Sequence, residues 1–553
     1  MTLNKLTFPV FLMLLCLSSC QKSTTPKFDI WVPYDETGLI ENNANHDNER
    51  LRYKLIQSKI SDRNKLIETI TVQLQDFSVE RYEALRPFIL DQSITKLQEN
   101  IFDGIFTYKE LSQWYLYRIA EFESDKDLAM NAMISINPNL ISQAEKCDVN
   151  AKEKNHPIYG IPVILKDNIN TKNMLTTAGA AALINNQPKS DAEIVTNLKS
   201  HGALILGKAN LSEWANFLCD GCPNGYSAIG GQTLNPYGPR NFDTGGSSSG
   251  SAVSVAMNYA PAAVGTETSG SILSPSSQQS TVGLKPTIGR LSQEGIIPIS
   301  STLDTAGPIT KNLDDNAILF SAMLKPADDT SMSNKAWQID LKKDLKGVRF
   351  GAIKSFVEDS LYRNALSDLK KLGAEIIEIE PEPMNFESFL DLLNADMKID
   401  LKQYLNTYAS PEVEVKSVYD VIQFNLKDST TRIPYCQARF DGVFNSEISK
   451  DSLIKIRAQL LKSGINYFEK PMQTHNLNAI LSINNYNAGQ AAAAKFPALT
   501  VPMGYDESGE PKGLTFIAKP NNEAEIYRFA KYFENSTKHR KSPELKTDKT
   551  TEL

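Results

Sequence analysis

The chain has 553 residues, of which 41% are hydrophobic and 22% charged, and its formal net charge is −7 at pH 7. This length and balance are ordinary for a globular protein that buries a large core, and they require no membrane-spanning segment. Nucleic acids and anionic surfaces select strongly basic proteins. We therefore expect no nucleic acid among the partners of this chain.

The first residues form a segment of their own. Lys5 precedes an apolar run at residues 8–17, which has the length of a signal-peptide core and is too short to cross a bilayer. The following LSSC, ending at Cys20, resembles the lipobox of bacterial lipoproteins, in which the cysteine becomes the lipidated first residue. We expect residues 1–19 to be a lipoprotein signal peptide, and the protein to be exported and lipid-anchored to a bacterial membrane, in the periplasm or cell envelope. A plain signal peptide with a chance cysteine is the alternative.

Composition divides the rest of the chain. Residues 20–33 are polar and proline-bounded, as is typical of a tether. Residues 34–92 are charged and predict a helical N-terminal extension. Residues 93–540 contain no convincing linker and predict one domain, whereas residues 541–553 have the composition of a disordered tail. The apolar residues that we expect on one helical face of the extension are Leu51, Leu55, Ile60, Leu66 and Ile70.

Two helix starts carry capping signals. Thr107 and Glu110 have the spacing of a capping box ahead of an apolar run. Asp191 is expected to cap a second helix, which extends to His201 and is closed by Gly202.

Strand-like and helix-like segments alternate from residue 158 onward. The continuous apolar segment at 158–165 predicts a strand, and the strand-like segments at 203–207, 347–353, 374–379 and 479–483 predict further buried strands. This alternation predicts an α/β fold.

Residues 244–271 contain two turns rich in glycine and serine. The first, GGSSSG at 245–250, precedes small and apolar residues at 251–259 that suit a buried helix, whose free N–H groups would point at the turn. In the second turn, at 268–271, successive N–H groups can converge on one point near the hydroxyl of Ser271, as an oxyanion hole requires. A flexible low-complexity turn is the alternative, but a linker does not run straight into a buried apolar segment.

Lys166 ends the apolar segment at 158–165. Desolvation at that position disfavours the ammonium form and lowers the pKa, which is the condition for a lysine base. A lysine that extends its charge to solvent at a strand end is the alternative.

These segments resemble the signature region of the amidase signature family. The resemblance rests on the two turns, with Ser247 and Ser271 at this separation, and on GIPVILKDNI at 160–169. Five further segments between residues 211 and 310 are similar to peptide-amidase-like members: LSEWANF, GGQTLNPYG, VGLKPTIG, IIPIS and DTAGPIT. The resemblance covers roughly residues 93–540 and implies the amidase-signature fold, a mixed twisted β-sheet core flanked by helices on both faces.

The resemblance also implies the roles of the site residues. Lys166 would be the base, Ser247, with an unusual cis peptide, the serine that relays the proton, and Ser271 the nucleophile. A serine hydroxyl is a poor nucleophile until a base takes its proton, and Ser247 can both donate and accept a hydrogen bond. Water would then hydrolyse an acyl-enzyme on Ser271. The implied oxyanion hole consists of the backbone N–H groups of Thr268, Ser269, Gly270 and Ser271.

Two other serine motifs are present. GSSSG would make Ser248 the nucleophile of an α/β-hydrolase, but residues 235–244 before it do not resemble a strand, and neither His475 nor His539 lies in a recognisable loop. Residues 93–96 match SxxK, but no KTG follows and the segment resembles a helix surface.

Cys219 and Cys222 form a CxxC motif. A zinc half-site is disfavoured because there is no second CxxC and the whole chain has only 5 histidines. A disulfide and two free thiols stay open as states of this pair. We expect neither a metal nor a cofactor.

The sequence departs from the family pattern beside the nucleophile. Ser269 stands where peptide-amidase-like relatives usually have aspartate and other members glycine, and residues 278–280 are more polar than usual. Ser269 would contribute through its backbone, so the change bears on substrate preference. The similarity to peptide-amidase-like members implies an uncharged small amide or peptide amide as substrate. Without the aspartate we expect little advantage from a free α-ammonium next to the scissile amide.

The expected reaction is hydrolysis of a carboxylic or peptide primary amide to acid and ammonia, with a membrane contacted through the lipid anchor. A glutaminase subunit of a tRNA-dependent amidotransferase is an alternative, against which the signal peptide argues. A non-catalytic lipoprotein of the same fold is another, against which the three intact positions argue.

Overall fold

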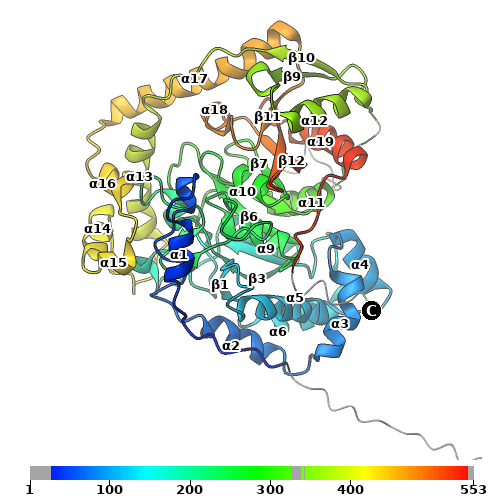
Figure 1. Cartoon of the computed structure of the whole chain (residues 1–553), viewed down its shortest axis with the longest axis vertical. Helices are drawn as coiled ribbons and strands as arrows, with labels where there is room; N and C mark the ends of the chain where they lie inside the picture. The colour runs from blue at the N-terminus through cyan, green and yellow to red at the C-terminus, as the bar shows by residue number, and fades with distance from the viewer. Residues whose placement is uncertain (1–25, 326–337, 340, 342, 546–553) are drawn as a thin grey trace, which may run out of the picture.

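The computed structural model describes residues 26–325, 338, 339, 341 and 343–545 (Figure 1). Within these residues an 11-stranded sheet forms the centre, in the order β1-β3-β2-β6-β8-β7-β12-β13-β11-β9-β10, and β4 pairs with β5 separately. The strands are β1 (Met133–Ile136), β2 (Pro162–Lys166), β3 (Leu204–Ala209), β4 (Tyr226–Ser227), β5 (Gly231–Gln232), β6 (Ala262–Glu267), β7 (Val282–Lys285), β8 (Thr305–Thr310), β9 (Arg349–Ile353), β10 (Glu375–Ile379), β11 (Ala479–Ile483), β12 (Ala498–Tyr505) and β13 (Pro511–Ile517).

Helices flank this sheet. They are α1 (Thr37–Asn43), α2 (Asn64–Gln73), α3 (Val79–Ile89), α4 (Ile94–Phe102), α5 (Tyr108–Glu123), α6 (Leu140–Val149), α7 (Glu193–Ser200), α8 (Glu213–Asn216), α9 (Ser249–Ala256), α10 (Leu273–Gln278), α11 (Leu313–Met323), α12 (Ser360–Lys371), α13 (Phe389–Thr407), α14 (Val418–Leu426), α15 (Ser429–Arg432), α16 (Ala438–Phe444), α17 (Lys450–His475), α18 (Ala488–Ala493) and α19 (Glu523–Thr537). None of the helices in the described part of the chain has the length and apolar character needed to cross a membrane.

The sheet is mixed. β2 runs parallel to β3 and β6, and β9 runs parallel to β10 and β11, whereas β6, β8, β7, β12, β13 and β11 are antiparallel neighbours. The strands β2, β3, β6, β7 and β8 are buried along their whole length. Full burial explains why β2 and β3 are mainly apolar in the sequence rather than alternating. β10, at the edge of the sheet, is mostly exposed or partly exposed, so the prediction of a buried strand at 374–379 is wrong. The predicted α/β fold, a mixed sheet flanked by helices, is confirmed.

Four groups of helices lie around the sheet. α9 and α10 pack on each other and on the central strands, and α19 packs on α11, on α12 and on β12. The helices α2, α3, α5 and α6 lie together at the β1 end (Figure 1). The yellow to orange helices α13–α17 enclose a second apolar cluster, which extends to the segment at 297–303 beside the candidate site.

The capping box predicted at the start of α5 is confirmed. The backbone N–H of Glu110 donates to the hydroxyl of Thr107 at 3.1 Å, and the backbone N–H of Thr107 donates to the Glu110 carboxylate at 3.1 Å. Almost every residue of α5 is buried, including Trp114 and Ile119. The cap therefore begins a helix that the core surrounds.

The prediction that Asp191 caps the next helix is wrong. α7 begins at Glu193, after Ala192, and no side chain caps its first turn. The carboxylate of Asp191 instead accepts hydrogen bonds from the backbone N–H of Lys172 at 2.9 Å and from Nζ of Lys199 at 2.7 Å. Asp191 thus joins a preceding loop to the last turn of α7.

The segment predicted to be a tether packs on the folded body from residue 26 onward, which corrects that prediction. The rings of Phe28 and Tyr117 have centroids 5.3 Å apart, and the backbone N–H of Trp31 donates at 2.8 Å to the side chain that begins α2. The ring of Phe28 and the backbone of Trp31 therefore attach this segment to the folded body. Cys20 and the predicted signal peptide lie outside the described residues.

The extension at 34–92 contains α1, α2 and α3 as predicted, but Leu55 and Ile60 are not on a helix. Leu66 and Ile70 do lie on the buried face of α2. The segment between α1 and α2 bonds instead to the β4–β5 hairpin: the carbonyl of Ile56 accepts from the backbone N–H of Gln232 at 2.8 Å. These tertiary hydrogen bonds override the helical periodicity there.

The beginning of the tail also differs from the prediction of disorder. The carbonyl of Lys541 accepts from the hydroxyl of Tyr237 at 2.6 Å, and the hydroxyl of Ser542 donates to the carboxylate of Asp91 at 2.6 Å. Leu545 is buried against the main core. Residues 541–545 therefore belong to the folded body, and residues 546–553 lie outside the described residues.

Thr107→Ala removes one bond of the capping box, so we expect it to lower the free energy of unfolding by about 1 kcal/mol. Chemical denaturation of the two proteins measures the change. Thr107→Ser keeps the hydroxyl and is the matched control, which should stay close to the parent. Equal destabilisation by both substitutions would contradict the assignment of the effect to the cap.

Candidate active site

Lys166 is buried at the end of β2, next to β6. Its Nζ donates to the hydroxyl of Ser247 at 2.7 Å, to the hydroxyl of Thr266 at 2.9 Å and to the carbonyl of Thr266 at 3.1 Å. Burial lowers the pKa of Lys166 to about 7, although the negative charges of Asp304 and Glu267 oppose that change. A substantial fraction of the amine is therefore neutral near pH 7, and the neutral form can accept a proton.

Ser247 lies in the first turn, and the peptide bond between Gly246 and Ser247 is cis, as the resemblance implies. The carbonyl of Ser247 accepts from the backbone N–H of Ser212 at 3.1 Å. A Cβ at Gly246 would lie 2.6 Å from the hydroxyl oxygen of Ser212 and 2.7 Å from Oδ1 of Asn224. Glycine is therefore required here because two other chain segments approach the backbone closely.

Ser248 connects the two turns. Its backbone N–H donates to the carbonyl of Ser271 at 3.1 Å. Its hydroxyl is fully buried, donates to the carbonyl of Thr266 at 3.1 Å and accepts from the N–H of Thr266 at 3.2 Å. Ser248, which matches the GxSxG motif, therefore links the two turns through hydrogen bonds. No strand directly precedes it, as an α/β-hydrolase would require, so the motif is a chance match.

Ser271 lies between β6 and α10 and is partly exposed. Among the described residues, its hydroxyl makes no hydrogen bond to Ser247 or Lys166. The backbone N–H groups of Ser269, Gly270 and Ser271 likewise have no acceptor within the part of the chain that the structure describes. In the described residues, the hydroxyl of Ser271 thus lies beside three consecutive backbone N–H groups that have no acceptor. This second turn is bonded to the first turn, which contains Ser247, through the N–H of Ser248.

Gly270 allows this second turn to form. Its φ is +90°, and a Cβ there would lie 2.8 Å from Nδ2 of Asn485, just before α18. The conformation and the close approach both exclude a larger residue. The amide of Asn485, which the sequence analysis did not single out, is consequently positioned beside the turn.

Two carboxylates that the sequence analysis missed hold the second turn. Oε2 of Glu267 accepts from the backbone N–H groups of Ile272 at 2.7 Å and Leu273 at 3.0 Å. Oδ1 of Asp304 accepts from the hydroxyl of Thr268 at 2.6 Å. Asp304 belongs to the DTAGPIT segment, and Glu267 directly precedes the turn. Their positions in the sequence could therefore have indicated that both lie near the site.

Oδ2 of Asp304 accepts from the backbone N–H groups of Ile299 at 2.8 Å and Ser300 at 3.0 Å. Burial raises the pKa of Asp304 to about 6. Its carboxylate therefore joins the IIPIS segment to the turn that carries Ser271, and it is largely ionised above that pH.

A buried ion pair supports the loop after Lys166. Nζ of Lys208 lies 3.4 Å from Oδ1 of Asp167 and donates to the hydroxyl of Thr176 at 2.9 Å. Oδ2 of Asp167 accepts from the backbone N–H of Thr177 at 3.0 Å. Burial raises the pKa of Asp167 and lowers that of Lys208, and their mutual attraction opposes both changes. Asp167 lies within the GIPVILKDNI segment, whereas Lys208 had no local signal.

A cavity of about 180 Å³ adjoins the second turn. Thr266 and Thr268 form its inner wall, and the exposed residues Glu294, Ser301 and Gln403 lie at its outer end. Ala215 joins the wall from α8, where Trp214, Ala215 and Asn216 have φ of 52°, 57° and 73°. Three consecutive non-glycine residues in the left-handed region are rare, and such strain is typical of functional sites. The LSEWANF segment thus lines the cavity with a stretch of left-handed backbone.

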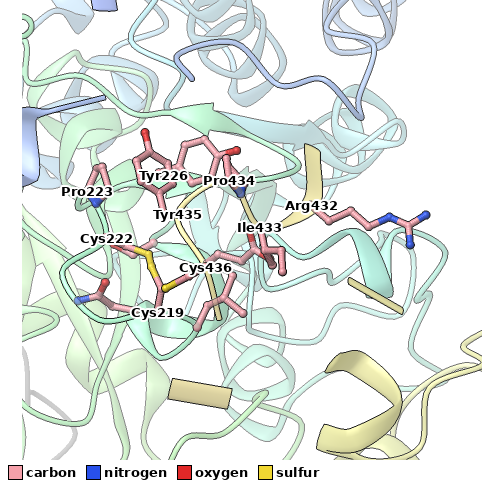
Figure 2. A pocket seen from close by; sticks show the side chains of 13 residues that line it. Cys219, Cys222, Pro223, Tyr226, Arg432, Ile433, Pro434, Tyr435 and Cys436 are labelled. Carbon is pink, nitrogen blue, oxygen red and sulfur yellow. A yellow bond between two sulfur atoms is a disulfide. The ribbon is translucent and has the colours of Figure 1, made fainter. Parts of the chain in front are cut away.

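The CxxC motif is closed by a disulfide between Cys219 and Cys222 (Figure 2). A small cavity of about 10 Å³ separates this loop from residues 432–436. The backbone N–H of Gly225, just after the disulfide, donates to the hydroxyl of Ser212 at 2.8 Å, and Ser212 in turn holds Ser247. Of the two states left open by the motif, the structure shows the disulfide. The disulfide closes the loop before Gly225, whose bond to Ser212 helps to position the first turn.

Comparison with known proteins identifies the family of this chain. A sequence model of the amidase family matches residues 111–527. A probable amidase of Arabidopsis thaliana is 34% identical over 79% of this chain and 88% of its own length. The A subunit of glutamyl-tRNA(Gln) amidotransferase from Pediococcus pentosaceus is 29% identical over 82% of this chain and 99% of its own.

Solved structures show the same fold. An amidase family protein from Bacillus anthracis superposes with a TM-score of 0.83 and 37% identity, covering 89% of this chain and 100% of that protein. The peptide amidase of Stenotrophomonas maltophilia superposes with a TM-score of 0.77 and 32% identity, covering 83% of this chain and 99% of the peptide amidase. The chain therefore belongs to the amidase signature family, whose amidases hydrolyse carbon–nitrogen bonds.

Proposed function

We propose that this protein is a serine amidase that hydrolyses small carboxylic or peptide primary amides to acid and ammonia. The observation that carries the proposal is the 2.7 Å hydrogen bond between Nζ of buried Lys166 and the hydroxyl of Ser247, beside the turn of Ser271. A buried lysine with a pKa of about 7 has the proton affinity that a base needs near neutral pH. The similarity to the peptide amidase supports an amide as the substrate.

In the proposed mechanism, Ser271 attacks the amide carbonyl. Ser247 accepts the proton of the Ser271 hydroxyl as it passes its own proton to neutral Lys166. Collapse of the tetrahedral intermediate releases the amine, which takes a proton from Ser247, and Lys166 returns a proton to Ser247. Water then attacks the acyl-enzyme by the same route and releases the acid. The missing Ser271–Ser247 hydrogen bond would form when substrate fills the site, as catalytic hydrogen bonds often tighten only then.

The free N–H groups of Ser269, Gly270 and Ser271 would receive the negative charge that develops on the carbonyl oxygen. Loss of one donor of this kind typically raises the barrier by about 3 to 4 kcal/mol. Glu267 and Asp304 hold the turn before substrate arrives. The donors are thus preorganised and need little reorganisation during the reaction.

A glutaminase subunit of a tRNA-dependent amidotransferase is the second candidate, because such A subunits are among the relatives. That role requires partner subunits and a charged tRNA in the cytosol. The signal-peptide-like residues 1–19 and the Cys219–Cys222 disulfide favour an exported protein instead, since structural disulfides persist in oxidising compartments. Ammonia release from glutamine against that from peptide amides distinguishes the two candidates.

We also propose that the protein is exported and anchored to a bacterial membrane by lipid on Cys20. The lipobox-like LSSC sequence supports this proposal. The aromatic contacts of Phe28 and Trp31 begin soon after Cys20, so the proposed anchor would hold the folded body close to the membrane.

We expect Ser271→Ala to lower kcat by about a thousandfold or more and to abolish labelling by a serine-directed phosphonate, because both need the same oxygen. Ser274→Ala, on the first turn of α10, is the matched control and should keep the label. Mass spectrometry locates the labelled residue. Labelling that survives Ser271→Ala but is lost in Ser248→Ala would show that the nucleophile is misassigned.

The kcat/KM of the parent enzyme should rise as the pH increases through about 7 and then level off, because only neutral Lys166 accepts a proton. Lys166→Met should be nearly inactive, and its thermal unfolding should show that it is folded. A pH profile that is flat between about pH 6 and 9, with chemistry shown to be rate-limiting, would rule out a lysine base that titrates in this range.

Cys20→Ser should move the protein from the membrane fraction to the soluble fraction when it is produced in a bacterium, because the substitution removes the acceptor of the lipid. Fractionation followed by immunoblotting measures the distribution. Cys436→Ser, which removes an exposed thiol of the folded body, is the control. Retention of Cys20→Ser on membranes in high salt would reveal a second attachment.

A further inference from the structure

The cavity beside the second turn has a polar inner end, an apolar middle and a charged outer end. Asn168 and Thr266 lie at the inner end, close to Lys166. Ile297 and Ile299 line the middle. Exposed and partly exposed side chains surround the outer end. An acyl group whose carbonyl lies at the turn would therefore extend past apolar walls toward charged groups.

The charged residues that line the cavity are Glu294, Asp304 and Asp400. Among the described lining residues there is no lysine or arginine. Asp304 is engaged by the turn and the IIPIS segment on both of its oxygens. Oδ2 of Asp400 accepts from the backbone N–H of Ser301 at 2.6 Å, and Glu294 is exposed. These two carboxylates leave acceptor capacity at the outer end without a lining cation.

Asn168 gives an independent indication of a ligand that donates hydrogen bonds. Its Nδ2 donates to the hydroxyl of Thr266 at 3.0 Å and to the carbonyl of Ile297 at 3.3 Å, which orients the amide. Its Oδ1 has no partner among the described residues, although the side chain is only 2% exposed. A buried acceptor without a donor is costly, so a donor from a bound molecule would satisfy it.

Two tyrosines also line the cavity, of which Tyr404 is buried and Tyr408 is partly exposed. The rings of Tyr404 and Tyr408 are stacked with centroids 5.8 Å apart, and both residues line the cavity. Aromatic faces attract ammonium and guanidinium groups. Carboxylates, aromatic rings and an apolar middle thus favour the same kind of group, an aliphatic chain that ends in a cation.

We propose that the cavity selects amides whose acyl part carries an aliphatic chain ending in an ammonium or guanidinium group. This inference rests on the proposed amidase function and names its substrate class. The amide NH₂ would donate to Oδ1 of Asn168, the aliphatic chain would contact Ile297 and Ile299, and the cation would lie between Asp400 and Glu294. It replaces the expectation of an uncharged substrate by one with a distal cation. It leaves the expectation from Ser269 in place, which concerned an ammonium next to the scissile amide.

The test compares N-acetyl-lysinamide with N-acetyl-norleucinamide. The two side chains have nearly the same shape, and acetylation removes the α-ammonium from both, so they differ in the distal charge. At about pH 8, where carboxylates are ionised and Lys166 is largely neutral, we expect kcat/KM for the lysine amide to be about tenfold higher or more. A ratio of one or less would overturn the proposal.

The double variant Asp400→Asn with Glu294→Gln should reduce this ratio to about one, because both substitutions remove charge but keep an oxygen acceptor. Asp391→Asn is the matched control, since Asp391 is a carboxylate on the same helix α13 as Asp400, but it is exposed and does not line the cavity. It should preserve the parent ratio. A ratio that is unchanged in the double variant would contradict the assignment to these carboxylates.

Binding to Ser271→Ala separates this inference from the proposed function. Calorimetry should show that the lysine amide binds about tenfold more tightly than the norleucine amide, whether or not the parent enzyme turns either over. If neither amide is hydrolysed but this preference is found, the proposed function fails and the cation site stands. If the two amides bind equally or neither binds, the cation site is wrong.

Discussion

The structure depends on the burial of one amine. Lys166 is enclosed at the end of β2, and its Nζ reaches only oxygen atoms of Ser247 and Thr266 among its hydrogen-bond partners in the described residues. Burial disfavours its ammonium form, which brings its pKa to about 7. In the proposed mechanism the apolar strand therefore serves the chemistry as well as the core, because an exposed lysine would be protonated and could not act as a base near neutral pH.

The two carboxylates that hold the second turn oppose the effect of burial on the pKa of Lys166. Glu267 and Asp304 carry negative charge that raises the pKa of Lys166, while their oxygens hold the turn of Ser271. The backbone bond from Ser248 to Ser271 joins the turns directly. The same two carboxylates therefore influence both the rigidity of the turn of Ser271 and the proton affinity of Lys166.

In the proposed mechanism, the residues around Ser271 separate the chemistry from the substrate preference. The turn itself is built from backbone and small side chains, and Ser269 offers it no charge. Besides Asp304, which holds the turn, the charged residues that line the cavity are Glu294 in a loop and Asp400 on α13. Substrate preference can therefore change through these peripheral segments while the Lys166–Ser247 pair and the turns stay constant.

By itself the sequence determined the α/β fold, the capping box at Thr107 and the segments that carry Lys166, Ser247 and Ser271, because buried strands, caps and glycine-rich turns have local signatures. Only the tertiary structure decided which distant groups meet there. Lys208 pairs with Asp167, Asp304 bonds to Thr268, and Asp400 reaches the cavity from α13. The same limit explains the failed cap at Asp191 and the missing helix at Leu55. In both places long-range partners took up the hydrogen bonds, and a local pattern contains no information about such partners.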